Sequence, residues 1–388
     1  MNATHLSYVN KTNLGSFYTP PHLVKLVYNT LKASIKTEVT GVVLEPACGY
    51  GSFFSVEFPF KKVRFVGSDI DPNAIKIAHQ TFPHIEFKTA NTLSGISREK
   101  LGIRDSERLI IVGNPPYNDI TSRVKNGIKS EPCVIENDIK TRDLGLSFLL
   151  ASAKLEPDYI AVLHPLSYII KKANFEILKS LMKAYKLLEC VVFSSQEFSD
   201  TSKFTGFPII VAVYEKNASG TLYNDIIKWR FKTLENQIFS VSDFDYVCKY
   251  IPKYPSRHLV PSKYKFYTMR DINALKRSRT FIMDDTDNTI FIPPEKLHYY
   301  CYIDIFKDII TQLPYYFGNM DVPFDKEGFE RIKDDFLTLS IAKHPEIFAD
   351  CFVVPDNEKI DRANLNVSIY FTKLFSGMKI CMMKTSRL

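Results

Sequence analysis

Four consecutive residues, Asn114, Pro115, Pro116 and Tyr117, follow an apolar run and have the groups needed to hold an amine. The two prolines lack backbone donors and keep the chain extended, so the Asn114 amide and the backbone carbonyls can point outward. Asn114 Oδ1 and the Pro115 carbonyl supply two acceptors, and Tyr117 offers a flat face for a planar base. A capped turn would explain an Asn-Pro pair alone, but the four residues together favour a substrate site.

A glycine turn and a carboxylate, both earlier in the chain, favour a nucleoside cofactor. Gly49 and Gly51 follow the apolar run 42–45, and bare backbone there lets a ligand approach closely. About 20 residues further on, Asp69 ends a second apolar run, where the ribose hydroxyls of a nucleoside would lie. Two structural alternatives stay open: the glycines could form only a tight connection, and Asp71 could cap the following helix.

A sheet is needed to bring these segments together. Short β-branched runs predict parallel strands at 42–45, 63–69, 109–114 and 159–163. Helical spacing predicts helices at 21–31, 71–80 and 144–155. Alternating strands and helices predict an α/β fold with a doubly wound, mostly parallel sheet.

The regular pattern ends in the middle of the chain. Runs at 187–193 and 208–214 lack a long helix between them, so they predict an antiparallel pair at the edge of the sheet. Beyond Tyr214, aromatic, proline and charged residues mix without a sustained period. We therefore expect one domain over residues 1–216 and a second over 217–388, whose fold the sequence does not reveal.

The composition excludes several classes of protein. With 45% hydrophobic and 24% charged residues, the chain is not disordered. Its seven cysteines form no Cys-x-x-Cys pair and its eight histidines lack metal-ligand spacing, so we expect neither a disulfide framework nor a metal site, and a structural role for His164. No stretch has the pattern of a signal peptide or a membrane span, which predicts a cytoplasmic protein without a membrane partner.

The net charge of +7 is concentrated between residues 249 and 279, where nine cations accompany one anion. Tyrosines and phenylalanines lie among these cations, a composition typical of a nucleic-acid surface. A solvated face is the alternative, but the position in the second domain favours DNA. The cations that we expect to bind DNA are Lys253, Arg257, Lys263, Lys265, Arg270, Lys276, Arg277 and Arg279.

Over about residues 15–215, the sequence resembles the gamma-class N6-adenine DNA methyltransferases. The matching segments, in the family's order, are 18–21, 44–53, 69–72, 114–117, 143–148 and 198–214. The resemblance implies an N-terminal catalytic domain with a Rossmann-like methyltransferase fold that binds S-adenosylmethionine, followed by a target-recognition domain. It also implies that the enzyme methylates N6 of an adenine flipped out of double-stranded DNA, at a site that includes Pro116 beside Asn114, Pro115 and Tyr117.

The resemblance also implies which residues hold the cofactor. The third strand of the family ends in an Asp that binds the cofactor's adenine amine, whereas this sequence offers Asn91, so we expect weaker cofactor binding without loss of function. The other residues expected to line the cofactor are Tyr18, Thr19, Pro20, Glu45, Ala47, Gly49, Asp69, Ile70, Phe148 and Asn114. Of these, Asp69 would bind the ribose, and Ile70 and Phe148 would cover the two faces of the adenine ring.

Some assignments stay open. A second aromatic side chain should stack on the target base opposite Tyr117, and Phe198 fits best, with Phe204 and Phe207 as alternatives. The charged segment 118–142 could be a loop that becomes ordered on DNA. N4-cytosine methylation, protein-glutamine methylation and a silent nucleic-acid-binding module are the rival functions. We expect a monomer, with any cognate restriction endonuclease on a separate chain.

Overall fold

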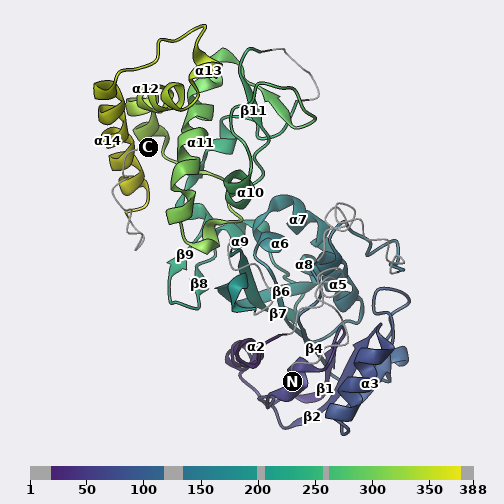
Figure 1. The fold of residues 1–388 in the computed structure, drawn as a ribbon. Helices are drawn as coiled ribbons and strands as arrows, with labels where there is room; N and C mark the ends of the chain where they lie inside the picture. Colours follow the sequence, from purple (N-terminus) through teal and green to yellow (C-terminus); the bar gives the residue numbers. More distant parts are fainter. Residues whose placement is uncertain (1–18, 118–133, 199–205, 257–261, 377–388) are drawn as a thin grey trace. The chain divides into compact units, whose positions relative to one another are not determined.

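The computed structural model describes residues 19–117, 134–198, 206–256 and 262–376. The chain divides into two compact units, Met1–Ser240 and Val241–Leu388, which are described one at a time (Figure 1). The first unit ends after the expected boundary at residue 216, because two short strands, β8 (Phe231–Thr233) and β9 (Ile238–Phe239), extend its sheet.

A nine-stranded sheet is the frame of the described part of the first unit. Its other strands are β1 (Thr40–Glu45), β2 (Lys62–Asp69), β3 (Glu86–Thr89), β4 (Leu109–Gly113), β5 (Tyr159–Pro165), β6 (Tyr185–Ser194) and β7 (Pro208–Lys216). Their order is β3-β2-β1-β4-β5-β7-β6-β8-β9. The first five of these strands pair in parallel, so their carboxyl ends meet at one edge of the sheet. The predicted α/β fold with a mostly parallel sheet is confirmed.

The antiparallel strands follow on the other side of β5. β7 runs antiparallel between β5 and β6, as the paired runs near residues 190 and 210 predict. The sheet then continues past this pair, because β8 joins β6 in parallel and β9 joins β8 in antiparallel fashion. The outermost strand is therefore β9, two strands beyond the pair that the sequence placed at the edge.

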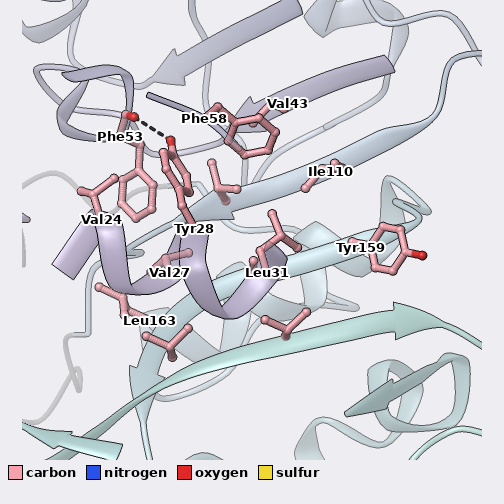
Figure 2. Packing of buried hydrophobic residues seen from close by; sticks show 14 of the residues in the cluster. Val24, Val27, Tyr28, Leu31, Val43, Phe53, Phe58, Ile110, Tyr159 and Leu163 are labelled. Carbon is pink, nitrogen blue, oxygen red and sulfur yellow. Dashed lines mark hydrogen bonds between the residues drawn. The ribbon is translucent and has the colours of Figure 1, made fainter. Parts of the chain in front are cut away.

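Helix α2 (Pro21–Ser34) covers one face of this sheet. Pro21 suits the first helical position because an N–H there has no helical partner. Apolar side chains at helical spacing pack on strand residues that include Val43 and Ile110 (Figure 2). Tyr28 lies on the same face, and its buried hydroxyl donates to the Phe53 carbonyl at 2.6 Å. Packing and hydrogen bonding thus fix the start of the described chain to the sheet.

Two further helices of the first unit begin at aspartates. Asp71 accepts from the Asn73 N–H at 2.9 Å and caps α3 (Pro72–Thr81), which confirms the cap alternative. Asp143 likewise caps α5 (Leu144–Lys154). The remaining helices of this unit are α6 (Ser167–Ile170), α7 (Lys172–Ile177), α8 (Lys179–Ala184) and α9 (Tyr223–Lys228).

Helices dominate the second unit, together with two small antiparallel sheets. Its helices are α10 (Ile272–Arg277), α11 (Leu297–Ile309), α12 (Lys326–Lys343), α13 (Pro345–Phe348) and α14 (Asn357–Leu374). Its strands pair as β10 (Asp245–Tyr246) with β13 (Pro323–Phe324) and β11 (Lys265–Tyr267) with β12 (Thr289–Phe291).

An aromatic core holds α11, α12 and α14 together. The buried ring of Tyr302 lies 5.1 Å from Phe336 and 5.9 Å from Phe371, measured between ring centroids. These three residues come from the three helices, so one cluster fixes their packing. In the described ranges of both units, no helix is both long and apolar enough to cross a bilayer.

Candidate active site

The four-residue segment after β4 lies at the carboxyl edge of the sheet, next to the residues that precede α2. Asn114 Nδ2 donates to the Thr19 hydroxyl at 3.1 Å, and the Tyr117 hydroxyl donates to Asn114 Oδ1. Asn114 is therefore held with its acceptor toward Tyr117 and its donor toward Thr19.

Tyr117 is partly buried and packs against the hydrophobic cluster beneath α2. Burial raises the pKa of its phenol, and the nearby Asp143 carboxylate raises that pKa further. Tyr117 is thus a neutral donor over the physiological range. Its ring can stack on a base, and its hydroxyl is held by Asn114.

The glycine turn and the carboxylate that the sequence singled out separately are joined by a hydrogen bond. The Gly49 N–H donates to Asp69 Oδ2 at 2.8 Å, and the Asp71 N–H donates to Asp69 Oδ1 at 2.9 Å. Gly49 has a φ of 50°, and a β-carbon there would meet nothing within 4 Å. A glycine is therefore favoured here by the positive φ of the backbone, because a side chain would meet no steric clash. The space beside Gly49 is open.

Glu45 ends β1 beside this turn with only 3% of its surface exposed. Burial, with the Asp69 carboxylate nearby, raises the pKa of Glu45 well above its usual range, although the Phe53 N–H opposes the shift. Within the described residues, Glu45 Oε2 and the Ser68 hydroxyl are buried without a hydrogen-bond partner. Orphaned buried polar atoms are costly, so their presence at two adjacent strand ends indicates a polar ligand.

These groups fit the expected cofactor, S-adenosylmethionine. The Glu45 and Asp69 carboxyl groups are of the kind that bind the hydroxyl and amine groups of such a molecule, and the positive-φ turn lets it approach the backbone. Ile70, directly after Asp69, is 54% exposed, an apolar surface open to an adenine ring. Phe148, on α5, is 9% exposed. Ala47 lies in the turn between β1 and Gly49, and Pro20 precedes α2.

Asn91, which stands where the family has an Asp, is engaged at both ends of its amide. Its Oδ1 accepts from the Leu93 N–H at 2.9 Å, and its Nδ2 donates to the Val134 carbonyl at 2.8 Å. A carboxylate could not donate to Val134. An amide oxygen, like a carboxylate oxygen, is an acceptor of the kind that a cofactor amine needs.

The structure places Phe198 in the core, with 4% of its surface exposed. Its ring centroid lies 6.0 Å from that of Phe193, in the cluster on which Tyr117 packs. As a clamp for the target base, Phe198 would have to leave this packing. Phe207 is partly buried at the same cluster. Phe204, Tyr18 and Arg257 lie outside the described residues, as does most of segment 118–142.

Sequence reasoning missed the residues that back Tyr117. It gave no role to Asp143, Gly145 or Tyr168, and it did not foresee the bond from Asn114 to Thr19. The Tyr168 hydroxyl donates to Asp143 Oδ1, which also accepts from the Gly145 N–H at 2.9 Å. Two signals point to this region: an Asp at the start of a helical run is a cap signal, and residues 143–148 are one of the segments that resemble the family.

In the second unit, the basic segment is partly neutralised by acids from elsewhere in the sequence. Lys263 pairs with Asp350 at 2.9 Å, Lys265 pairs with Asp285 at 2.7 Å, and Lys253 pairs with Asp321. The net positive charge around this segment is therefore lower in the folded structure than its sequence alone suggests. In the described part of the chain, four of the predicted cations have no ion pair, and they lie on or beside α10: Arg270, Lys276, Arg277 and Arg279.

Comparisons with known proteins give a match to one family. The sequence model of the family described as N-6 DNA Methylase matches residues 4–237. No curated protein matches the chain. A protein from Listeria monocytogenes assigned as a class I S-adenosylmethionine-dependent methyltransferase is 16% identical with a TM-score of 0.38, over 51% of this chain and 60% of that one. One from Pyrococcus horikoshii assigned as an RNA methyltransferase is 12% identical with a TM-score of 0.35, over 53% and 89%.

A third solved structure, the magnesium protoporphyrin IX methyltransferase of Synechocystis with bound S-adenosylmethionine, is 12% identical with a TM-score of 0.32, over 56% of this chain and 87% of that one. Identities and TM-scores this low give no information about the substrate of this chain. The family match, which covers more than half of the chain, is the finding on which assignment depends.

Proposed function

The chain belongs to the N-6 DNA methylase family, and from this premise we propose that it is a site-specific DNA methyltransferase that modifies N6 of a flipped adenine. Methyl transfer with S-adenosylmethionine as cofactor comes with the family. The choice of adenine is our proposal. It follows the family match, and the observation that supports transfer to an amine is the Asn114 amide, whose oxygen is turned toward Tyr117 while its nitrogen is engaged by Thr19.

The proposed mechanism relies on position and electrostatics. Asn114 Oδ1 and the Pro115 carbonyl accept the two amine hydrogens of the target adenine, and Tyr117 stacks on its ring. These acceptors draw the amine out of conjugation with the ring, which makes the nitrogen lone pair available for attack. When bound, S-adenosylmethionine supplies an electrophilic methyl group carried on a positively charged sulfur.

The target amine must take the place of the Tyr117 hydroxyl. That hydroxyl donates to Asn114 Oδ1 in the structure, so an arriving amine exchanges one donor for another. The acceptor is thereby kept hydrogen-bonded and oriented before substrate arrives. Little reorganisation of Asn114 is then needed, which is the condition for electrostatic stabilisation of the reaction.

The cofactor would be held by the residues around the strand ends of β1 and β2. Glu45, Asp69 and the Gly49 turn would bind its polar parts, and Ile70 would contact its adenine ring. Asn91 would accept from the adenine amine through its side-chain oxygen. The Thr19 hydroxyl, engaged by Asn114, would lie at the border between the cofactor and the target base.

DNA would be bound by the second unit through the cations that have no acidic partner. Arg270, Arg277 and Arg279 are exposed, and Lys276 is half-buried. Guanidinium groups suit both phosphates and base edges, so this surface fits a nucleic acid better than the ion-paired lysines do.

N4-cytosine methylation is the closest rival, because a cytosine amine fits the same two acceptors. Methylation of a protein glutamine is a further alternative through the same four residues. A role in a restriction-modification system, with a separate endonuclease, is part of the proposal, as are a monomeric and cytoplasmic protein.

One experiment separates the substrates. The purified protein would be incubated with S-adenosylmethionine and unmethylated duplex DNA, and the digested nucleosides would be identified by mass spectrometry, with a cofactor-free reaction as control. N6-methyldeoxyadenosine is the expected product. N4-methyldeoxycytidine instead would reassign the target base, and methyl incorporation into protein but not DNA would overturn the proposal.

A further inference from the structure

Gly145, in the first turn of α5, lies directly behind the ring of Tyr117. A β-carbon at Gly145 would lie 3.2 Å from Tyr117 Cδ1 and 2.5 Å from the Tyr168 hydroxyl oxygen. A glycine is therefore required here because any side chain would clash with these two tyrosines. Its φ is not in the left-handed region, so the backbone conformation alone would allow other residues. The helix start forms a surface against which the Tyr117 ring rests.

The position of Gly145 is set by Asp143. The carboxylate accepts from the Gly145 N–H at 2.9 Å, and the Asp143 carbonyl accepts from the Thr141 hydroxyl at 2.6 Å and from the Ser147 N–H at 3.3 Å. These bonds cap α5 and hold its first turn in a fixed conformation. Any rotation of Asp143 would move Gly145 and, with it, the support of Tyr117.

The direction of the Asp143 carboxylate is in turn set by Tyr168, whose hydroxyl donates to it. Tyr168 is 2% exposed, and its ring stacks on His164 with centroids 5.5 Å apart and planes 12° apart. His164 is fixed by the Tyr214 hydroxyl, 2.9 Å from Nε2, and by the Pro165 carbonyl, 3.0 Å from Nδ1. His164 is thus structural, and a chain of contacts runs from β5 and β7 to Tyr117.

The His164 ring at the base of this chain of contacts does not change its protonation near pH 7. Burial lowers the pKa of His164 to about 4, so its ring is neutral near pH 7. A neutral ring with a proton on Nδ1 donates to Pro165 and accepts from Tyr214. The His164 ring, on which Tyr168 stacks, therefore keeps one hydrogen-bonding arrangement.

We infer that Tyr168 and Asp143 are positioning residues for methyl transfer, which hold Gly145 and thereby the stacking face of Tyr117. The inference rests on the proposed function, in which Tyr117 supports the target base. Neither residue touches the base or the cofactor in this account. Their effect is on the rate of transfer and not on cofactor binding.

The test uses Tyr168→Phe, which removes only the hydroxyl, with Tyr185→Phe as matched control. Tyr185 is 1% exposed in the same unit, and its hydroxyl donates to the Pro157 carbonyl at 3.0 Å, away from the site. Single-turnover rates, S-adenosylmethionine affinity and thermal stability would be measured for both. Loss of a hydrogen bond to a charged partner predicts a rate about tenfold lower for Tyr168→Phe at unchanged cofactor affinity, and a rate near wild type for Tyr185→Phe.

A second pair of variants separates an effect on the position of Tyr117 from a general loss of protein stability. Gly145→Ala should lower the rate by about 10²-fold, because misplacing a reacting group costs that much. Adding Tyr168→Phe to Gly145→Ala removes the closest of the three contacts, the one to the Tyr168 hydroxyl, and should recover part of the rate. Equal rates for Tyr168→Phe and Tyr185→Phe, or no recovery in the double variant, would overturn the inference. A wild-type protein inactive on adenine would instead overturn the proposed function.

Discussion

The amide nitrogen of Asn114 donates to the Thr19 hydroxyl at 3.1 Å, across a sequence separation of 95 residues. Thr19 is also one of the residues expected to line the cofactor. The bond also ties Thr19 to the Asn114 amide, whose oxygen faces Tyr117.

This bond predicts that Thr19→Val lowers the rate of methyl transfer, because valine has the same shape but cannot accept from Nδ2. A neutral hydrogen bond contributes about 1 kcal/mol, so a several-fold loss is expected, and Thr19→Ser should retain the rate. Rates at saturating cofactor would measure the effect. Equal rates for the valine and serine variants would show that Thr19 does not orient Asn114.

Tyr117 is predicted to act through its ring. Tyr117→Phe keeps the stacking face and removes the hydroxyl that bonds Asn114, so the variant should retain most activity. Tyr117→Ala should lose about 1–3 kcal/mol of base stacking. Fluorescence of 2-aminopurine at the target position would report stacking directly. A phenylalanine variant as impaired as the alanine variant would give the hydroxyl the larger role.

Glu45→Gln is predicted to stabilise the ligand-free protein while weakening cofactor binding. The raised pKa of Glu45 means that the folded state favours the protonated carboxyl, so this group costs stability above its ordinary pKa and the cost vanishes as pH falls. The advantage of the glutamine variant should therefore be larger at pH 8 than at pH 5. Thermal unfolding with and without S-adenosylmethionine would test both parts, and a less stable glutamine variant at pH 8 would contradict the account.

The cations of the second unit are predicted to differ in how much they contribute to DNA binding. Replacing Arg277 and Arg279 with Ala should weaken binding and flatten the salt dependence by about 0.9 for each lost phosphate contact. Replacing Lys263 and Lys265, which pair with Asp350 and Asp285, should change the slope less. Binding titrations at several salt concentrations would compare the pairs. A larger change for the lysine pair would place the DNA surface elsewhere.

The sheet and the strand-end residues could be predicted because their signals are local. Strand β4 is a continuous apolar run, and the end of such a strand in a parallel sheet faces the ligand edge, which places Asn114. Asp71 could be recognised as a possible cap from Pro72 after it. In each case a few neighbouring residues contain the whole signal.

Contacts between distant segments could not be predicted in the same way. Lys263 looks like part of a basic run until the fold brings Asp350 against it. Phe198 has the sequence position of a base clamp, but its packing on Phe193 depends on the bend between β6 and the next turn. The second unit is built from aromatic contacts such as Tyr302 with Phe336, which leave no period in the sequence.

The most direct measurement of the central claim compares Asn114→Ala with Asn114→Asp in methyl transfer and in calorimetric binding of S-adenosylmethionine. The alanine variant lacks the acceptor for the target amine, and we predict a loss of about 10²–10³-fold in transfer rate, as for removal of a preorganised polar group. The aspartate variant keeps an acceptor oxygen and should lose less. Asn114 is also expected to border the cofactor, so cofactor affinity should fall in both variants, but by much less than the transfer rate of the alanine variant. An alanine variant that transfers methyl groups at the wild-type rate would contradict the account, since the target amine would then be held by other residues.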